Sequence, residues 1–202
     1  MLKPGDTARI NDAITQAESK TSGEIVAVLA QESDDYIYIP ILWASLAALL
    51  LPFPLIFLTR FGTADIYTLQ LALFIVLALI FSMPGLRRFV IPKRLRELRV
   101  HRRAAEQFLA RNLHTTEGRT GVLLFVSLAE RCAVILADEG IAAKVAPSTW
   151  QTIIDRLTAD IAAGRLADGL VAAVADCGNI LAAHFPPRPD DLDELPNHLV
   201  VL

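Results

Sequence analysis

Charged residues are missing from two long stretches of the sequence. None occurs from residue 36 to residue 59, and none occurs from residue 66 to residue 86. Within these stretches lie two predominantly apolar runs, Ile37–Leu58 and Ile66–Met83, which a short loop at residues 60–65 joins. A helix rises about 1.5 Å per residue, so roughly 20 apolar residues cross the hydrocarbon core of a bilayer. The pattern predicts a transmembrane helical hairpin, in preference to two buried helices of a soluble domain.

Cysteine is scarce, and its positions match neither a Cys-x-x-Cys motif nor the motif of a cysteine phosphatase. The sequence has two cysteines, Cys132 and Cys177, without Cys-x-x-Cys spacing. The residue six positions after each is not arginine, which excludes the phosphate cradle of a cysteine phosphatase. In a reducing cytoplasm we expect both to be small buried hydrophobic residues. A disulfide between them would require their close approach in the fold.

Other catalytic motifs are missing as well. The sequence contains no P-loop, no glycine signature of a dinucleotide site and no Gly-x-Ser-x-Gly elbow. Asp191 and Asp193 have the spacing of a nucleophilic aspartate pair, but they lie in a proline-flanked acidic tail rather than after a buried strand. The histidines have no spacing typical of metal ligands: His101, His114, His184 and His198. The sequence therefore identifies no catalytic residue.

Basic residues gather directly after the second apolar run. We expect those nearest the run to orient the hairpin and to contact lipid headgroups: Arg87, Arg88, Lys93, Arg94 and Arg96. The loop between the two runs offers only Arg60. The positive-inside rule then predicts a two-pass membrane protein with both termini in the cytoplasm. Because the chain is mildly acidic, with a net charge of −3, we do not expect nucleic-acid binding.

The polar remainder, about 150 residues, has the size of one domain. Periodic apolar residues predict helices over Thr7–Ser19, Arg94–Leu113, Thr149–Ala163 and from Asp168 or Gly169 to Ala183. β-rich runs predict strands over Glu24–Gln31, Val122–Leu128 and Cys132–Ala137. The short spacing of the last two strands favours an antiparallel β-hairpin.

This order of elements predicts an α/β fold in which a small mixed sheet has helices on both faces. The transmembrane hairpin, residues 37–86, is inserted after the first strand, so the cytoplasmic domain comprises residues 1–36 and 87–202. Pro52 and Pro54 lie inside the first apolar run and are expected to kink its helix or end it early.

The strand and turn motifs resemble those of a known family. The likeness lies in Thr21–Val26 after a helix, in the strand Gly121–Leu124, in the stretch Ile135–Ile141 and in the helix around Trp150. With the tail His184–Pro196 these segments resemble the TPM domain family, also labelled TPM phosphatase, in its membrane-anchored bacterial branch. The resemblance covers nearly all of the polar part of the chain. It implies a three-layer α/β/α sandwich with a small mixed sheet, here held at the bacterial inner membrane.

The resemblance implies two alternative functions. Some members of the family are acid phosphatases, others bind calcium, and others assist the assembly or repair of membrane complexes. Because no catalytic motif is present, we expect a non-enzymatic accessory or assembly factor for a membrane protein partner. The alternative is a phosphatase that depends on a divalent cation. The sequence departs from the family at Arg119-Thr120-Gly121, where an asparagine commonly precedes the glycine.

Carboxylates at strand ends are the candidates for a ligand site. Asp34 and Asp35 follow the first strand, and Asp138 and Glu139 follow the third. Ligands gather at strand ends in open α/β sheets, and hard cations such as Ca²⁺ take several oxygen ligands. If the four residues met at one rim, they would form a weak divalent-cation site. Otherwise Asp34 and Asp35 mark the membrane boundary, while Asp138 and Glu139 form a turn with a helix cap.

Overall fold

The structure is a computed structural model, and it describes all residues except 1, 4, 34–35, 37, 84–90 and 189–193. The chain divides into two compact units. The first unit comprises Met1–Ser33 and Glu97–Leu202, and the second comprises Asp34–Arg96.

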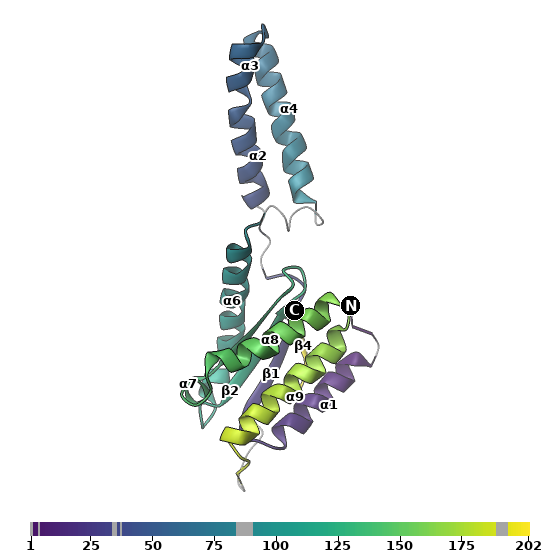
Figure 1. The fold of residues 1–202 in the computed structure, drawn as a ribbon, viewed down its shortest axis with the longest axis vertical. Helices are drawn as coiled ribbons and strands as arrows, with labels where there is room; N and C mark the ends of the chain where they lie inside the picture. The colour runs from purple at the N-terminus through teal and green to yellow at the C-terminus, as the bar shows by residue number, and fades with distance from the viewer. Residues whose placement is uncertain (1, 4, 34–35, 37, 84–90, 189–193) are drawn as a thin grey trace. The chain divides into compact units, whose positions relative to one another are not determined.

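The first unit contains a four-stranded mixed sheet (Figure 1). Its strands, in spatial order, are β3 (Cys132–Ala137), β2 (Gly121–Ser127), β1 (Glu24–Ala30) and β4 (Val200–Val201). β1 is parallel to both β2 and β4, whereas β2 and β3 form an antiparallel hairpin. The predicted mixed sheet and β-hairpin are confirmed. The C-terminal strand β4 was not predicted.

The helices of this unit follow the predicted order closely. They are α1 (Asp6–Glu18), α6 (Lys93–Ala110, whose first four residues fall in the second unit), α7 (Glu139–Ala142), α8 (Pro147–Ala162) and α9 (Leu166–His184). The predicted helix Arg94–Leu113 is shorter than expected, because α6 ends at Ala110 and a separate 3₁₀ turn, Leu113–Thr115, follows it. α8 begins with Pro147, a position where the missing N–H group has no helical partner to lose.

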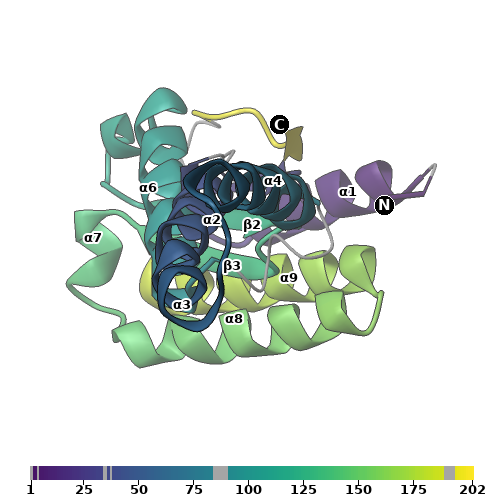
Figure 2. The ribbon, with the colours of Figure 1, turned by 90° about the horizontal axis from the view of Figure 1, so that it is seen from above.

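Both faces of the central strands β1 and β2 are buried, and each face belongs to a different hydrophobic cluster. Alternate side chains of β1 divide between them: Ile25, Ala27 and Leu29 join one cluster, and Val26, Val28 and Ala30 join the other. The first cluster includes residues of α1, α8 and α9, and the second includes Val100 and Ala104 of α6. Figure 2 shows α6 and α8 on opposite sides of β2 and β3. The predicted arrangement of helices on both faces is thus present.

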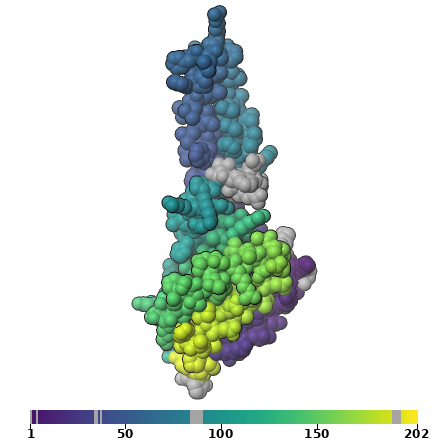
Figure 3. Space-filling view, in the orientation of Figure 1, coloured from purple at the N-terminus to yellow at the C-terminus, as the bar shows by residue number. Residues whose placement is uncertain are grey.

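α9 is apolar enough to cross a membrane by length and composition, yet it belongs to the core of the first unit. It has 19 residues and a mean hydropathy of 1.5, and half of its most apolar window is buried. Leu170, Val174 and Leu181 on this helix are fully buried within the cluster that contains β1 and β2. In the space-filling view the atoms of α8, α9 and α1 lie against one another (Figure 3).

The second unit is an antiparallel pair of apolar helices. Its first arm, Tyr38–Leu58, has 21 residues and a mean hydropathy of 2.3, and only 11% of its most apolar window is buried. The arm divides into α2 (Tyr38–Leu50) and α3 (Pro52–Leu58), as the two prolines predict. The second arm, α4 (Thr63–Ser82), has 20 residues, a mean hydropathy of 2.1 and none of its window buried.

Small residues let the two arms of this unit approach closely. Ala44 and Ala48 of α2 lie one helical turn apart and are 0% and 4% exposed. Larger apolar side chains of the same helix, such as Leu42, Leu46 and Leu49, face outward. Small residues at a helix–helix contact with bulky apolar residues on the opposite side are typical of packing within lipid.

Candidate functional site

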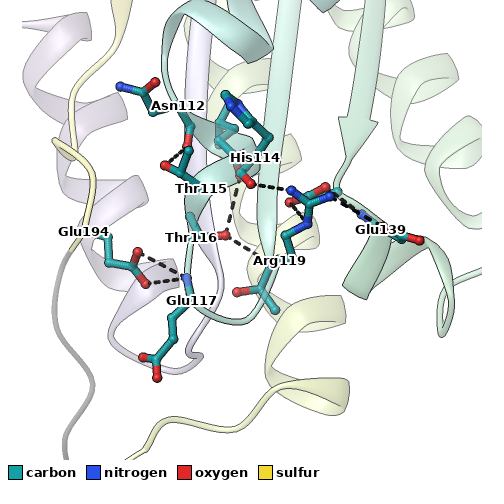
Figure 4. A network of polar contacts seen from close by, with 11 residues as sticks. Asn112, His114, Thr115, Thr116, Glu117, Arg119, Glu139 and Glu194 are labelled. Carbon is teal, nitrogen blue, oxygen red and sulfur yellow. Dashed lines mark hydrogen bonds and ion pairs between the residues drawn. The ribbon is translucent and has the colours of Figure 1, made fainter.

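Polar side chains gather at one edge of the sheet, where β1 and β2 begin and β3 ends. Glu24 at the start of β1 lies opposite Gly121 at the start of β2. Val122 lies opposite Ala137, so Asp138 and Glu139 after β3 are next to the loop that leads into β2. Figure 4 shows this loop, residues 112–120, together with its polar contacts.

Asp138 is the buried carboxylate of this edge, with 7% of its surface exposed. It is the N-cap of α7, because its Oδ1 accepts the N–H of Glu139 at 2.8 Å. Its Oδ2 is buried without a hydrogen bond and lies 3.6 Å from the Nε of Arg119. The predicted turn with a helix cap at Asp138 and Glu139 is therefore present.

Arg119 forms an ion pair with Asp138 and also contacts His114 and Glu139. Its Nη1 donates to the backbone carbonyl of His114 at 2.6 Å, and its Nη2 lies 3.4 Å from Oε2 of Glu139 (Figure 4). The backbone of Arg119 has a φ of 52°, in the left-handed region that few non-glycine residues adopt. The family departure in this loop concerns Thr120, the residue before Gly121, so the sequence pattern did not indicate this role of Arg119. The partners of Arg119 follow from the register of the β2–β3 hairpin, for which the sequence carries no local signal.

A second group of carboxylates fastens the C-terminal tail to the same edge. The N–H of Glu194 donates to Oε1 of Glu24 at 3.2 Å. The carboxylate of Glu194 in turn accepts the N–H of Glu117 at 3.2 and 3.3 Å. Glu24 is 8% exposed. These contacts hold the tail against the loop before it continues to β4.

The opposite edge of the sheet is where β1 and β2 end. There the buried carboxylate of Glu130 accepts hydrogen bonds from the hydroxyl of Ser127 and from the N–H of Ser33, the latter at 3.1 Å. Asp34 and Asp35 lie outside the described residues. Ser33, which precedes them, lies at this edge, whereas Asp138 and Glu139 lie at the other.

The described part of the chain contains no group of three or more His, Cys, Asp or Glu side chains that could hold a metal ion. At the edge around Asp138, one carboxylate oxygen caps a helix and the other faces a guanidinium group. A cation such as Ca²⁺ takes about six to eight oxygen ligands. With the Arg119 guanidinium beside them, the two adjacent carboxylates do not fit such an ion. The predicted site of Asp34, Asp35, Asp138 and Glu139 stays a prediction, because two of its members lie outside the described residues.

Of the residues predicted to contact lipid headgroups, some lie within the described part of the chain and some outside it. Arg87 and Arg88 lie outside the described residues. Lys93 and Arg94 are exposed in the first turn of α6, and Arg96 is half-buried.

Neither cysteine forms a disulfide. Cys177 is fully buried, as predicted, but Cys132 is only half-buried. Burial raises the pKa of the Cys177 thiol from its ordinary value of 9.0 to about 12, and the negative charge of Asp176 acts in the same direction. A thiol in this environment is not a nucleophile at neutral pH.

A polar hollow of about 630 Å³ lies between α8 and α9. It is lined by Ser148, Thr149, Thr152, Ile153, Asp176, Asn179 and Ile180, and it is widely open to solvent. Its one acidic residue, Asp176, accepts a hydrogen bond from Arg156 at 3.1 Å. The residues that line it do not pair a nucleophile with a general base.

Comparisons with known proteins agree with this fold. A family model described as the TPM domain matches residues 88–180, which run from just before α6 into α9. No curated protein matches the sequence. Among solved structures, the NMR structure of the BA42 protein from the psychrophilic bacterium Bizionia argentinensis has a TM-score of 0.63 and 24% sequence identity. That match covers 100% of this chain and 96% of the other. The chain therefore shares the fold of BA42, and a TPM domain is recognised in nearly half of its length.

Proposed function

We propose that this chain is a membrane-anchored accessory or assembly factor that presents a TPM-like α/β domain to a membrane protein partner. The observation that carries the proposal is the exposed apolar surface of α2, α3 and α4. Leu49, Phe57 and Leu58 are 70%, 72% and 81% exposed. Fully burying one such side chain contributes roughly 1.5–3 kcal/mol, and soluble proteins rarely leave large contiguous apolar patches in water. A bilayer is the environment that fits this surface.

The proposed location is the bacterial inner membrane, with two passes and both termini in the cytoplasm. The argument is the distribution of basic residues, since Arg87, Arg88, Lys93, Arg94 and Arg96 follow the second arm while only Arg60 lies in the loop between the arms. Basic residues near an anionic leaflet contribute about 1 kcal/mol each. The proposed partners of the chain therefore include the lipid bilayer as well as a membrane protein.

The accessory role is supported by how the conspicuous carboxylates of the first unit are used. Asp138 caps α7 and faces Arg119, Glu24 and Glu194 fasten the tail, and Glu130 holds Ser33. Each is engaged in holding the fold together. A general acid or base needs a proton-transfer partner in a place that substrate can reach. The outer surface of the domain is therefore proposed to be the working part.

A phosphatase assay separates this proposal from the alternative of a divalent-cation-dependent phosphatase. The full-length protein in detergent micelles is assayed with a chromogenic phosphate ester, with and without Ca²⁺ or Mg²⁺. We expect hydrolysis no faster than in protein-free micelles. Metal-dependent activity that disappears in Asp138→Ala or Glu139→Ala, and persists in the control Glu106→Ala on the exposed face of α6, would establish the enzyme instead.

The accessory role has its own test in native membranes. Crosslinking with affinity capture identifies the membrane protein that the chain contacts, and the assembled amount of that protein is then measured after depletion of the chain. We expect the assembled amount to fall and to recover when the full-length chain is restored. An unchanged amount after depletion would contradict the assembly role.

A further inference from the structure

The guanidinium group of Arg119 lies close to three oxygens from two segments, the loop before β2 and the start of α7. They are the backbone carbonyl of His114 at 2.6 Å, Oε2 of Glu139 at 3.4 Å and Oδ2 of Asp138 at 3.6 Å. Backbone carbonyls and carboxylates are also the ligands that Ca²⁺ takes in proteins. These oxygens therefore resemble part of a Ca²⁺ ligand set, but the positive charge beside them is the guanidinium group of Arg119.

The backbone fixes Arg119 in this position. Its N–H donates to the carbonyl of Thr116 at 3.0 Å, and its own carbonyl accepts the N–H of Gly140 at 3.1 Å. A Cβ at Gly140 would lie 2.6 Å from the carbonyl oxygen of Gly118 and 2.7 Å from that of Arg119. The loop therefore packs directly on the start of α7, and only glycine fits at the contact. Backbone hydrogen bonds and the contact with Gly140 fix the main chain of Arg119, and the carbonyl of His114 fixes its guanidinium group.

The charges at this edge explain why a cation is needed. Asp138 is only 7% exposed, and its Oδ2 has no hydrogen bond. An ionised carboxylate that is withdrawn from water is costly unless a positive charge accompanies it. Arg119 supplies that charge at the closest approach of 3.6 Å.

We propose that Arg119 is a built-in cation that takes the place of a divalent metal ion at the Asp138–Glu139 pair and excludes such an ion from it. This inference does not rest on the membrane anchor or on the accessory role. Its physical consequence is that the fold of this edge is independent of Ca²⁺, because the countercharge comes from the chain.

The test measures the thermal stability of the full-length protein in detergent, with CaCl₂ and with a chelator. Of the two tryptophans, Trp150 is buried in the first unit, so in a Trp43→Phe background its fluorescence reports unfolding of that unit. For the wild type we expect the same Tm in both conditions. For Arg119→Asn, a residue that tolerates the left-handed backbone, we expect a lower Tm in chelator and a rise of about 3–6 °C when Ca²⁺ is about tenfold above its dissociation constant.

Matched variants isolate the cause. Arg131 also has a positive φ, of 51°, but it lies in the β2–β3 turn at the other edge of the sheet, so Arg131→Asn should respond to Ca²⁺ no more than the wild type. Adding Asp138→Asn to Arg119→Asn should abolish the rise. If Arg119→Asn does not fold in chelator but folds with Ca²⁺, the proposal is supported. If it folds in neither condition, Arg119→Gly, which suits the backbone, carries the same expectation.

Two results would overturn the inference. One is a Ca²⁺-dependent rise in the Tm of the wild type that Asp138→Asn removes, because the pair would then bind the ion with Arg119 present. The other is a folded Arg119→Asn or Arg119→Gly variant whose Tm does not respond to Ca²⁺, because removal of the guanidinium would then open no cation site.

Discussion

Cys177 combines complete burial with a strongly shifted thiol. It lies in α9 with none of its surface exposed, in the cluster that includes β1 and β2. Loss of hydration raises its pKa to about 12, and Asp176 adds to the shift. The neutral thiol is thus the form that the folded state accepts, and this makes stability depend on pH in the alkaline range.

We predict that the free energy of unfolding falls between pH 9 and pH 12 because of this residue. The unfolded thiol loses its proton near pH 9.0 while the folded thiol keeps it up to about pH 12. The contribution is therefore complete below pH 9 and is lost as the pH rises toward 12, by at most about 1.4 kcal/mol per pH unit. Denaturant unfolding of the wild type and Cys177→Ala, measured at a series of pH values, isolates the term, since all other titrating groups are shared. Parallel curves for the two proteins would refute the prediction.

Arg119 illustrates what sequence reasoning misses at the level of single residues. An arginine in a loop carries no signal for its backbone angle or its partners. Its contact with Asp138 follows only from the pairing of Val122 with Ala137, which brings the residues flanking β2 and β3 together. The β-hairpin itself was predictable from two apolar runs with a short spacing. Its register, and therefore the residues that meet at its open end, was not.

At the scale of elements, α1 and α9 pack closely at Gly178. Among the described glycines that lie between two helices, a Cβ added here would come nearest to the neighbouring helix. A Cβ at Gly178 of α9 would lie 2.6 Å from the Cβ of Ala17 in α1 and 3.1 Å from its Cα. Neither atom can move away without shifting the backbone of α1. The absence of a side chain at Gly178 thus sets the distance between these helices.

We predict that Gly178→Ala destabilises the first unit by about 1–2 kcal/mol. Helix propensity alone would make the substitution stabilising by about 1 kcal/mol, but overpacking at a rigid contact typically costs about 1–3 kcal/mol. The sign of the change, measured by denaturant unfolding, therefore decides between the two effects. The double variant Ala17→Gly, Gly178→Ala moves the missing methyl to the other helix and should recover part of the loss. A stabilised single variant would show that α1 is free to shift.

Strand direction is the part of the fold that local patterns determine least. The first three strands were predicted within one residue at each end, because their apolar runs are bounded by polar residues or glycine. β3 runs antiparallel to β2, so it ends at the edge where β1 begins. The two residues of β4 follow a proline-containing tail, and their pairing with Val28 and Leu29 depends on contacts far apart in the sequence. Such pairings have no local signature.

At the scale of the whole molecule, the apolar helices interrupt the sheet in sequence. β1 precedes α2, and its partner β2 follows α6, yet the two strands pair along seven residues from Glu24 to Ala30. β1 is also the strand that links β2 to β4. Truncation at any single point that removes α2, α3 and α4 therefore removes either β1 or everything that β1 pairs with. A single truncation therefore cannot separate the apolar helices from a complete sheet.

The proposed membrane topology gives the last prediction. A reporter inserted in the loop between α3 and α4, at residues 60–65, should lie on the opposite side of the membrane from a reporter at the C-terminus. The physical reason is the excess of basic residues after α4, which are held on the cytoplasmic side.

Neutralising Arg87, Arg88, Lys93, Arg94 and Arg96 while adding lysines to the loop should reduce or invert this orientation. The matched control neutralises Arg102 and Arg103, farther along α6, and should leave it largely unchanged. Reporters on the same side in the wild type would exclude a two-pass hairpin, and an orientation indifferent to the basic cluster would exclude its proposed role.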